Sequence, residues 1–256
     1  MPKNNILLPN TIINNTIGEP FIELDIADST NNYAMSQLKK GLSQHGAAYF
    51  AHLQTSGKGR HGKQWLSNKS ENIMLTVVLN TSALAVSTQF ILSMLIALAA
   101  HDLFAKHAGD ETKIKWPNDI YWRDRKAAGI LIENIIRARK WQWCIAGIGI
   151  NINQVNFSQS LMNPVSLKQI TGKAFDIVAL AKELCENIDT YFNSFNETYI
   201  LEKYNEVLYK RNEKVILKRN EIFFDCLIKN VTGEGKLIIE QKGKEKEITE
   251  VEWLFT

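Results

Sequence analysis

The segment Gln54-Thr55-Ser56-Gly57-Lys58-Gly59-Arg60-His61-Gly62-Lys63-Gln64-Trp65 alternates three glycines with the cations Lys58, Arg60 and Lys63. Glycines let the backbone pass close to a ligand, and the cations favour a ligand with negative charge. The segment therefore predicts an anion-binding loop. It differs from the phosphate loop and from the dinucleotide fingerprint, because both of those run directly into a helix. An apolar strand, residues 72–79, follows here instead. A flexible basic surface loop is the alternative interpretation.

Length and composition describe an ordinary globular protein. The chain has 256 residues, is 45% hydrophobic and carries a formal charge of +3. This length accommodates one large core and a small second domain. The small charge indicates no dedicated nucleic-acid surface, so no nucleic-acid partner is expected. The longest apolar run, residues 90–100, is too short to span a bilayer, and the N-terminus has no basic-then-apolar signal, so no membrane association is expected.

The cysteines and histidines limit the chemistry further. Cys144, Cys185 and Cys226 stand far apart and form no Cys-x-x-Cys pair, which argues against a disulfide framework and against a zinc site. A reducing cytoplasm is the expected location. None of the five histidines belongs to a His-Glu-x-x-His pattern, so we predict no metal bound by side chains alone. Any metal is expected to arrive with a nucleotide.

The chain before and just after the loop alternates strand and helix patterns. Residues 1–19 predict an irregular or strand-forming lead-in, and residues 21–26 alternate as a half-buried strand does. Asp28-Ser29-Thr30-Asn31 is a cluster of capping residues before a predicted helix that reaches Gly46. Residues 47–53 predict a buried strand that leads into the loop, and Ser87-Thr88 is expected to cap a long apolar helix. For Ser29 and Thr30, simple helix capping is the alternative to a functional role.

A second chemically rich segment reads Lys115-Trp116-Pro117-Asn118-Asp119. It places a cation, an aromatic ring and a carboxylate around a proline that interrupts any strand ladder, which is typical of a site. After a turn at Asp124-Arg125-Lys126, residues 127–133 predict a buried strand that contains Gly129. Residues 141–150 predict another strand, with Gly147 and Gly149 near its end. Glycine inside a strand indicates either close approach of a ligand or tight strand packing.

The C-terminal part has a different pattern. Ile170-Thr171-Gly172 is expected to end a loop, Asp176 to cap a helix that reaches Phe192, and residues 198–208 to form a second helix. Four short strands follow at residues 214–218, 223–228, 236–240 and 246–249, separated by turn signals. This spacing predicts a small closed barrel. We place the boundary near residues 210–213, which gives one domain over residues 1–209 and another over residues 210–256.

Together, four segments resemble the biotin protein ligases. They are Asp28-Ser29-Thr30-Asn31, the loop at residues 54–65, the Lys115-Trp116-Pro117-Asn118-Asp119 segment with Arg125-Lys126-x-x-Gly129-Ile130, and Gly147-Ile148-Gly149-Ile150-Asn151. They occur in the family's order and at its approximate spacing. The resemblance implies an α+β catalytic domain, with a mixed sheet and flanking helices, that is related to class II aminoacyl-tRNA synthetases and lipoate ligases. It also implies a C-terminal barrel of the Src-homology-3 (SH3) type.

The implied activity is an ATP-dependent ligation in two steps. Biotin is first activated as biotinyl-5′-AMP, and the biotinyl group then passes to a lysine of a biotin carboxyl carrier domain in a biotin-dependent carboxylase. In a partly desolvated site, a carboxylate and a polyphosphate repel each other by roughly several kcal/mol. The cations of the loop, Lys126 and a Mg²⁺ ion brought by the nucleotide would offset that repulsion.

The resemblance also assigns roles to individual residues. Arg60 and Lys126 are implied to face the carboxylate and the activated phosphate, and Asp119 to orient Mg²⁺ or to assist the acceptor amine. The implied biotin site consists of Ser29, Thr30, Gln54, Gly57, Lys58, Arg60, Lys126, Gly129, Gly147 and Gly149. The implied ATP site consists of Lys58, Arg60, Lys63, Trp65, Lys115, Asn118, Lys126 and Asn151.

Two departures from the family pattern are visible. The family loop commonly reads Gly-Arg-Gly-Arg-x-Gly, and Lys58 stands at the first arginine, so a point charge replaces a bidentate group and adenylate retention is expected to be looser. Bifunctional members carry a winged helix-turn-helix before the first catalytic strand, where only residues 1–20 stand here. We therefore expect a monofunctional ligase rather than a repressor.

Two other functions stay open. A lipoate or octanoate ligase of the same fold would also form an acyl adenylate. Octanoyl transferases of this fold use a cysteine nucleophile, but Cys144 and Cys185 lie in a strand and a helix whose patterns bury them. A non-catalytic anion-binding module is the alternative from a different class. A homodimer paired through a sheet edge is compatible with the sequence, which does not locate that edge.

Overall fold

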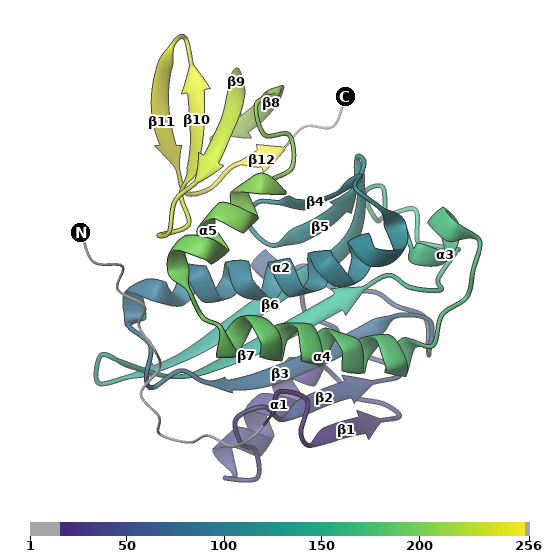
Figure 1. Ribbon diagram of the computed structural model, residues 1–256. Helices are drawn as coiled ribbons and strands as arrows, with labels where there is room; N and C mark the ends of the chain where they lie inside the picture. The colour runs from purple at the N-terminus through teal and green to yellow at the C-terminus, as the bar shows by residue number, and fades with distance from the viewer. Residues whose placement is uncertain (1–15, 254–256) are drawn as a thin grey trace.

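The structure of the chain is a computed structural model that describes residues 16–253. Most of the predicted lead-in, residues 1–15, lies outside the described residues. The described chain folds into a seven-stranded sheet with helices on both faces and a second, five-stranded sheet at its C-terminal end (Figure 1). The α+β class predicted from the sequence is confirmed, and each predicted strand and helix between residues 21 and 249 has a counterpart in the structure.

The large sheet is mixed, as predicted. Its strand order is β1-β2-β3-β7-β6-β5-β4, with β1 and β2 parallel and every other neighbouring pair antiparallel. The strands are β1 (Phe21–Leu24), β2 (Ala48–Ala51), β3 (Ile73–Asn80), β4 (Thr112–Lys115), β5 (Asp119–Trp122), β6 (Arg125–Arg137) and β7 (Lys140–Ile150). Pro117 stands between β4 and β5, where the sequence predicted an interruption.

The pleat of the sheet divides its side chains between two layers. Ala48, Phe50 and Val77 face the main core, together with buried residues of α2 (Gln89–Ala108) and α4 (Ile177–Asn193). Tyr49 and Val78, which alternate with them, form a smaller cluster beneath α1 (Thr30–Lys39). Because successive strand residues point to opposite faces, this alternation defines an α1 face and an α2 face of the sheet.

Helix α2 is the central helix of the core. It lies across the sheet beside α4 and α5 (Glu197–Glu206) (Figure 1). The prediction from residues 90–100 that this segment is too short for a bilayer needs correction, since the helix with its preceding turn is long and apolar enough by length and composition. However, 72% of its most apolar window is buried inside the protein, which identifies it as a core helix.

The C-terminal sheet contains the four predicted strands and one more. They are β8 (Lys214–Arg219), β9 (Ile222–Val231), β10 (Leu237–Gln241), β11 (Lys244–Ile248) and β12 (Glu252–Trp253), in the order β11-β10-β9-β8-β12. The sheet sits against the end of the large sheet, where Trp116 Nε1 donates a hydrogen bond to Gly235 O at 3.0 Å (Figure 1). Its order ends at β11 and β12, so closure into a barrel stays a prediction.

The helices differ from the sequence prediction at two points, the cap of α2 and the segment before Gly172. Asp176 caps α4 as predicted, accepting hydrogen bonds from Val178 N and Ala179 N. Thr88 does not cap α2 with its side chain, because its hydroxyl donates to Ala85 O at 2.8 Å instead. The segment predicted as a loop before Gly172 contains a short helix, α3 (Leu167–Thr171), which begins with a capping box at Ser166.

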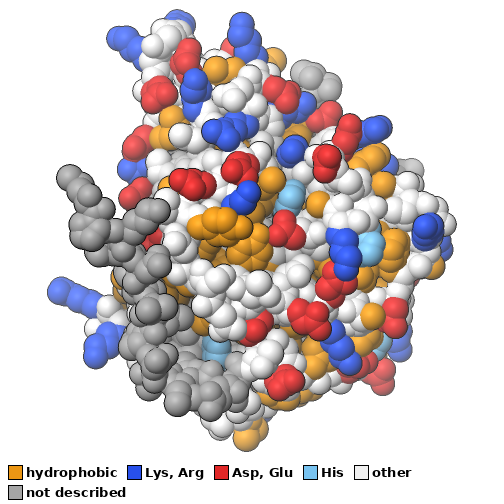
Figure 2. All heavy atoms as spheres, viewed as in Figure 1, with side chains coloured by type: hydrophobic (Ala, Val, Ile, Leu, Met, Phe, Trp, Pro, Cys, Tyr) orange, Lys and Arg blue, Asp and Glu red, His pale blue; other side chains and the backbone are white. Residues whose placement is uncertain are grey.

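On the face shown in Figure 2, which lies over α2, α4 and α5, positive and negative side chains are interspersed, and neither sign forms a large patch. This distribution agrees with the small formal charge of +3.

Candidate active site

The floor of the site is a row of small residues on the α1 face of the large sheet. Gly147 of β7 stands between Thr76 of β3 and Leu131 of β6 in the strand register. Two residues along, Gly149 pairs with Gly129 of β6. The period of two places all of these on the same face as the cluster beneath α1. The missing side chains leave space above the sheet at the ends of α1 and of the anion loop.

Side chains of the protein itself occupy part of that space. A methyl group at Gly147 would lie 2.2 Å from Asn31 Oδ1, and one at Gly149 would lie 2.4 Å from Trp65 Cε2. At Gly129 the nearest atom, Trp65 Cζ3, would be at 3.2 Å. These glycines therefore admit Asn31 and the Trp65 ring. The sequence left open whether they mark a ligand or tight packing, and the described contacts are packing contacts.

The beginning of α1 meets the end of β2 in a polar pair. Gln54 Oε1 accepts hydrogen bonds from Thr30 N at 2.7 Å and from Thr30 Oγ1 at 3.1 Å. Ser29 is the N-cap residue of α1, yet its side chain makes no capping bond and is 2% exposed. Simple capping therefore does not account for either side chain. The structure brings Thr30 and Gln54 into contact, next to Ser29 at the start of α1, and binding of biotin by these three residues stays a prediction.

Residues 57–65 fold back on themselves as a tight hairpin. Gly59 N donates to Lys63 O at 2.7 Å and Trp65 N donates to Gly57 O at 2.9 Å. A methyl group at Gly57 would lie 2.4 Å from Trp65 O, so this close approach requires glycine. A short 3₁₀ turn, η1 (Arg60–Gly62), forms the tip.

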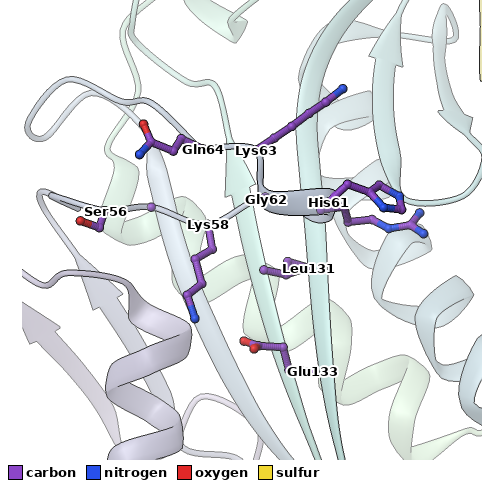
Figure 3. A pocket seen from close by; sticks show the side chains of 11 residues that line it. Ser56, Lys58, His61, Gly62, Lys63, Gln64, Leu131 and Glu133 are labelled. Atoms are coloured by element: carbon purple, nitrogen blue, oxygen red, sulfur yellow. The ribbon is translucent and has the colours of Figure 1, made fainter.

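The cations of the loop point in different directions. The loop borders a cavity of about 550 Å³ that is also lined by Leu131 and Glu133. In Figure 3, Lys58 extends into this space toward Glu133, whereas Lys63 points away from it. The Lys58 ammonium donates to Asn32 Oδ1 on α1. Lys58, the position that departs from the family pattern, thus contacts the helix rather than joining Arg60 and Lys126.

Arg60 joins the loop to the bend at Pro117. Its Nη1 donates to Asn118 Oδ1 at 3.1 Å, and Asn118 Nδ2 donates in turn to Ile130 O at 2.6 Å. Beside this contact, Lys126 Nζ and Asp119 Oδ1 form an ion pair at 2.7 Å in which both side chains are partly buried. Arg60, Asn118, Asp119 and Lys126, which come from three separate segments of the sequence, therefore lie in one cluster.

Lys115 is the buried cation of this cluster. It is 7% exposed, its Nζ lies 3.3 Å from Tyr121 Oη, and the ammonium sits 4.6 Å from the Tyr121 ring centroid and 5.3 Å from that of Trp253. Burial lowers the Lys115 pKa to about 7; Asp119 opposes the shift, and the positive charges of Lys126 and Lys63 add to it. Neither Tyr121 nor Trp253 was predicted from the sequence. Tyr121 stands two residues after the Lys115–Asp119 segment, which could have pointed to it, but no sequence signal pointed to Trp253.

Asn151 has a structural role in the described chain. It is 4% exposed, and its side-chain amide donates to Val165 O at 3.1 Å and to Lys126 O at 3.3 Å. Its amide protons are thus directed to backbone carbonyls that hold residues 163–166 against the start of β6. Contact with a nucleotide, which the resemblance implied for Asn151, stays a prediction.

The cysteines behave as buried apolar residues. Cys144, Cys185 and Cys226 are all buried free thiols. Burial raises the pKa of Cys185 to about 12 and that of Cys226 to about 11, and it raises the Cys144 pKa further still. A thiol with a raised pKa is a poor nucleophile at neutral pH. The sequence interpretation of Cys144 and Cys185 as small hydrophobic residues is confirmed.

One face of the sheet carries a row of glycines, with a polar pair at one end of the row and a cation cluster at the other. This geometry is expected for activating an anionic substrate with a nucleotide. Residues 23–151 match a family model that is described as the "Biotin/lipoate A/B protein ligase family". The chain belongs to this family. The family resemblance inferred from the four sequence segments is confirmed, and all four lie within or overlap the matched residues.

Curated relatives include both bifunctional and plain ligases. The bifunctional ligase/repressor BirA of Escherichia coli is 29% identical over 231 residues, which is 86% of this chain and 69% of that protein. The biotin–[acetyl-CoA-carboxylase] ligase of Paracoccus denitrificans is 35% identical over 156 residues, covering 58% of this chain and 63% of that protein.

Among solved structures, the biotin protein ligase of Aquifex aeolicus in complex with biotin and ATP has a TM-score of 0.75 at 24% identity. The alignment covers 91% of this chain and 98% of that chain. At this level of identity, the match establishes the fold.

Proposed function

We propose that the chain is an ATP-dependent biotin–protein ligase. The observation that carries the proposal is the convergence, on one face of the sheet, of the Thr30–Gln54 pair with the cluster of Arg60, Lys115 and Lys126. The first set supplies the hydroxyl and amide groups that a ureido ring requires, and the second supplies positive charge for a carboxylate and a polyphosphate. Biotin is named in the relative from Paracoccus denitrificans, a biotin–[acetyl-CoA-carboxylase] ligase, and this name supports the choice of biotin.

In the first step, a biotin carboxylate oxygen attacks the α-phosphorus of ATP, and the bond to the departing pyrophosphate breaks. Arg60 reaches this region from the loop, and Lys126 reaches it from the start of β6. Two cations there reduce the repulsion between the two anions. Lys115 adds a third cation whose charge depends on pH near neutrality, because its pKa is about 7. We assign Lys63, Asn118 and Trp65 to the same nucleotide side of the site.

In the second step, the amine of an acceptor lysine attacks the mixed anhydride, an amide forms and AMP leaves. The amine must lose a proton, since the ordinary lysine pKa is about 10.4. We propose Asp119 as the group that positions this amine and accepts its proton. Its Oδ1 is already bonded to Lys126, so its other oxygen is the one that would face the acceptor.

Mg²⁺ fits this site as an ion brought by the nucleotide. Among residues 16–253 no group of three or more His, Cys, Asp or Glu side chains is placed to hold a metal. Asp119 and Asn118 nevertheless offer hard oxygen ligands of the kind that Mg²⁺ accepts alongside phosphate oxygens. When bound, the ion would neutralise part of the pyrophosphate charge.

The proposed protein partner is a biotin carboxyl carrier domain of a biotin-dependent carboxylase, in the cytoplasm. A homodimer is also proposed, and the outer edge of β6 is the place for it. Strand β5 pairs with β6 only between Arg125 and Gly129, and no described strand pairs with the outer edge of residues 130–137. Such an edge is open to pairing with a second chain. We further propose domains at residues 1–209 and 210–256, the second closing as an SH3-type barrel.

Exchange of labelled pyrophosphate into ATP tests the proposal. The assay runs in parallel with biotin, with lipoate, with octanoate and with no acid, followed by transfer to a purified carrier domain. We expect exchange only with biotin, and a biotinylated carrier lysine in the second stage. Exchange driven by lipoate or octanoate would assign the chain to the lipoate branch of the family. Absence of exchange with every acid would favour a non-catalytic binding module.

A further inference from the structure

A buried hydroxyl on β3 links the side chains of the first two residues of α1. Thr76 is completely buried and lies on the α1 face of the sheet beside Gly147. Its Oγ1 is 2.8 Å from Thr30 Oγ1 and 2.7 Å from Asn31 Oδ1. The single hydroxyl proton is thus placed between two oxygens of consecutive residues at the start of α1.

Asn31 extends this contact across the sheet to β6. Its Nδ2 donates to Glu133 Oε2 at 2.8 Å and to Leu131 O at 3.3 Å, and its side chain is 3% exposed. The side chain fits here only because β7 has glycine at position 147, where a methyl group would lie 2.2 Å from Asn31 Oδ1. A continuous hydrogen-bonded chain therefore runs from Gln54 through Thr30, Thr76 and Asn31 to Glu133.

At the Thr30 end, this series of hydrogen bonds fixes the orientation of the Gln54 carboxamide. Its Oε1 accepts two hydrogen bonds from Thr30, so the amide nitrogen is turned the other way, toward the loop at Gly57. That nitrogen lies 3.0 Å from where a methyl group of residue 57 would stand. Gln54 consequently presents an N–H donor beside Gly57 at the start of the loop. A cyclic urea has a carbonyl acceptor for such a donor, whereas a dithiolane or an alkyl chain has none.

We propose that Thr76 and Asn31 are positioning residues, which orient Thr30 and the Gln54 amide donor toward a ureido carbonyl and so select a cyclic urea over an apolar acyl head group. This inference rests on the proposed function, since it concerns the same acid substrate. A site that must hydrogen-bond its substrate rejects an analogue without the matching group, because its buried polar groups are then left unpaired.

Thr76→Val tests the inference, because it removes the hydroxyl and keeps the shape. Thr76→Ser keeps the hydroxyl. Thr81→Val is a matched control, since Thr81 is also fully buried just after β3 but its hydroxyl has no partner among the described residues. We expect Thr76→Val to raise the KM for biotin about 3- to 10-fold, the effect of one lost hydrogen bond. The KM for ATP and kcat at saturating biotin should stay unchanged, and Thr76→Ser and Thr81→Val should resemble the unaltered protein.

The preference for biotin over an analogue without the ureido oxygen is a second measurement, and a purely structural role of Thr76 would not change it. 2-Iminobiotin lacks the ureido oxygen, so its KM should rise less in Thr76→Val than the KM for biotin. If Thr76→Val is unstable, Asn31→Asp carries the test: it places two carboxylates against each other, and adding Glu133→Gln should recover much of the lost biotin affinity.

Equal KM increases for biotin and ATP, an unchanged KM for biotin in Thr76→Val, or no recovery by Glu133→Gln would overturn the inference. If the unaltered protein shows no biotin-dependent exchange, the proposed function fails and the inference falls with it. If the unaltered protein is active and Thr76→Val matches it, the inference alone fails.

Discussion

Gly149→Ala should displace the Trp65 ring from the floor of the site. The added methyl carbon would lie 2.4 Å from Cε2, 2.7 Å from Cζ2 and 2.8 Å from Cδ2 of that ring. Normal carbon contacts are 3.5–4.0 Å, so the ring would have to move by about 1 Å or leave the sheet. Overpacking of this kind costs about 1–3 kcal/mol of unfolding free energy. For a chain of this size, each kcal/mol corresponds to roughly 2–4 °C in Tm.

Two other glycines give a scale for the expected loss of unfolding free energy. At Gly129 the nearest ring atom would be 3.2 Å away, so a shift of a few tenths of an ångström suffices and Gly129→Ala should cost less. At Gly233 the nearest atom is Ile91 Cδ1 at 3.5 Å, an ordinary contact, which makes Gly233→Ala the control for replacing a glycine without a clash. Thermal and urea denaturation of the three variants should therefore rank Gly149→Ala as the least stable.

A double-mutant cycle with Trp65→Ala isolates the ring as the cause. In the Trp65→Ala background the clash is gone, so adding Gly149→Ala should cost much less than it does in the unaltered protein. The KM for ATP should rise in Gly149→Ala, because Trp65 belongs to the proposed nucleotide side of the site. Equal losses of unfolding free energy with and without the Trp65 ring would refute the reasoning.

Three further outcomes follow from the site. Lys126→Ala should slow biotin-dependent pyrophosphate exchange by about 10²-fold or more, as loss of one preorganised donor does, and near-normal exchange would refute its role. Lys115 has a folded pKa of about 7, below its ordinary value, so between pH 7 and pH 10 the unfolded chain binds more protons and unfolding free energy rises with pH. This rise is at most about 1.4 kcal/mol per pH unit, and urea denaturation of Lys115→Met should show a flatter dependence; identical slopes would contradict the burial argument. Limited proteolysis within residues 56–63 should slow when biotin or the adenylate binds, and equal rates with and without ligand would exclude ordering of the loop.

The parts of the fold that the sequence predicted are those with a local cause. Strand β3 and helix α4 follow from apolar runs and from the Asp176 cap, which involve neighbours in the chain. Strand β12 escaped prediction because it has two residues and exists only through pairing with β8. The Thr88 hydroxyl was expected to cap α2, but a carbonyl three residues earlier satisfies it.

The site shows the same division between local and distant causes. The family resemblance pointed to Thr30, Gln54, Lys126 and Asp119, and the fold brings Thr30 to Gln54 and Lys126 to Asp119. A glycine in a strand does not reveal what fills the space above it, so Asn31 over Gly147 could not be read from the chain. Lys58 was grouped with the other loop cations, whereas only the three-dimensional path of the loop directs it to Asn32.

The position of Trp253 affects how this protein can be altered. Its ring lies 5.3 Å from the Lys115 ammonium and 5.7 Å from the Tyr209 ring, so the last described strand covers a charged group of the site. Any tag, fusion partner or exchanged C-terminal segment that moves this ring would expose Lys115 to water and return its pKa toward the ordinary value. With Lys115 in its proposed place beside the nucleotide, the pH range for nucleotide binding would then shift, although no residue of the large sheet had been changed.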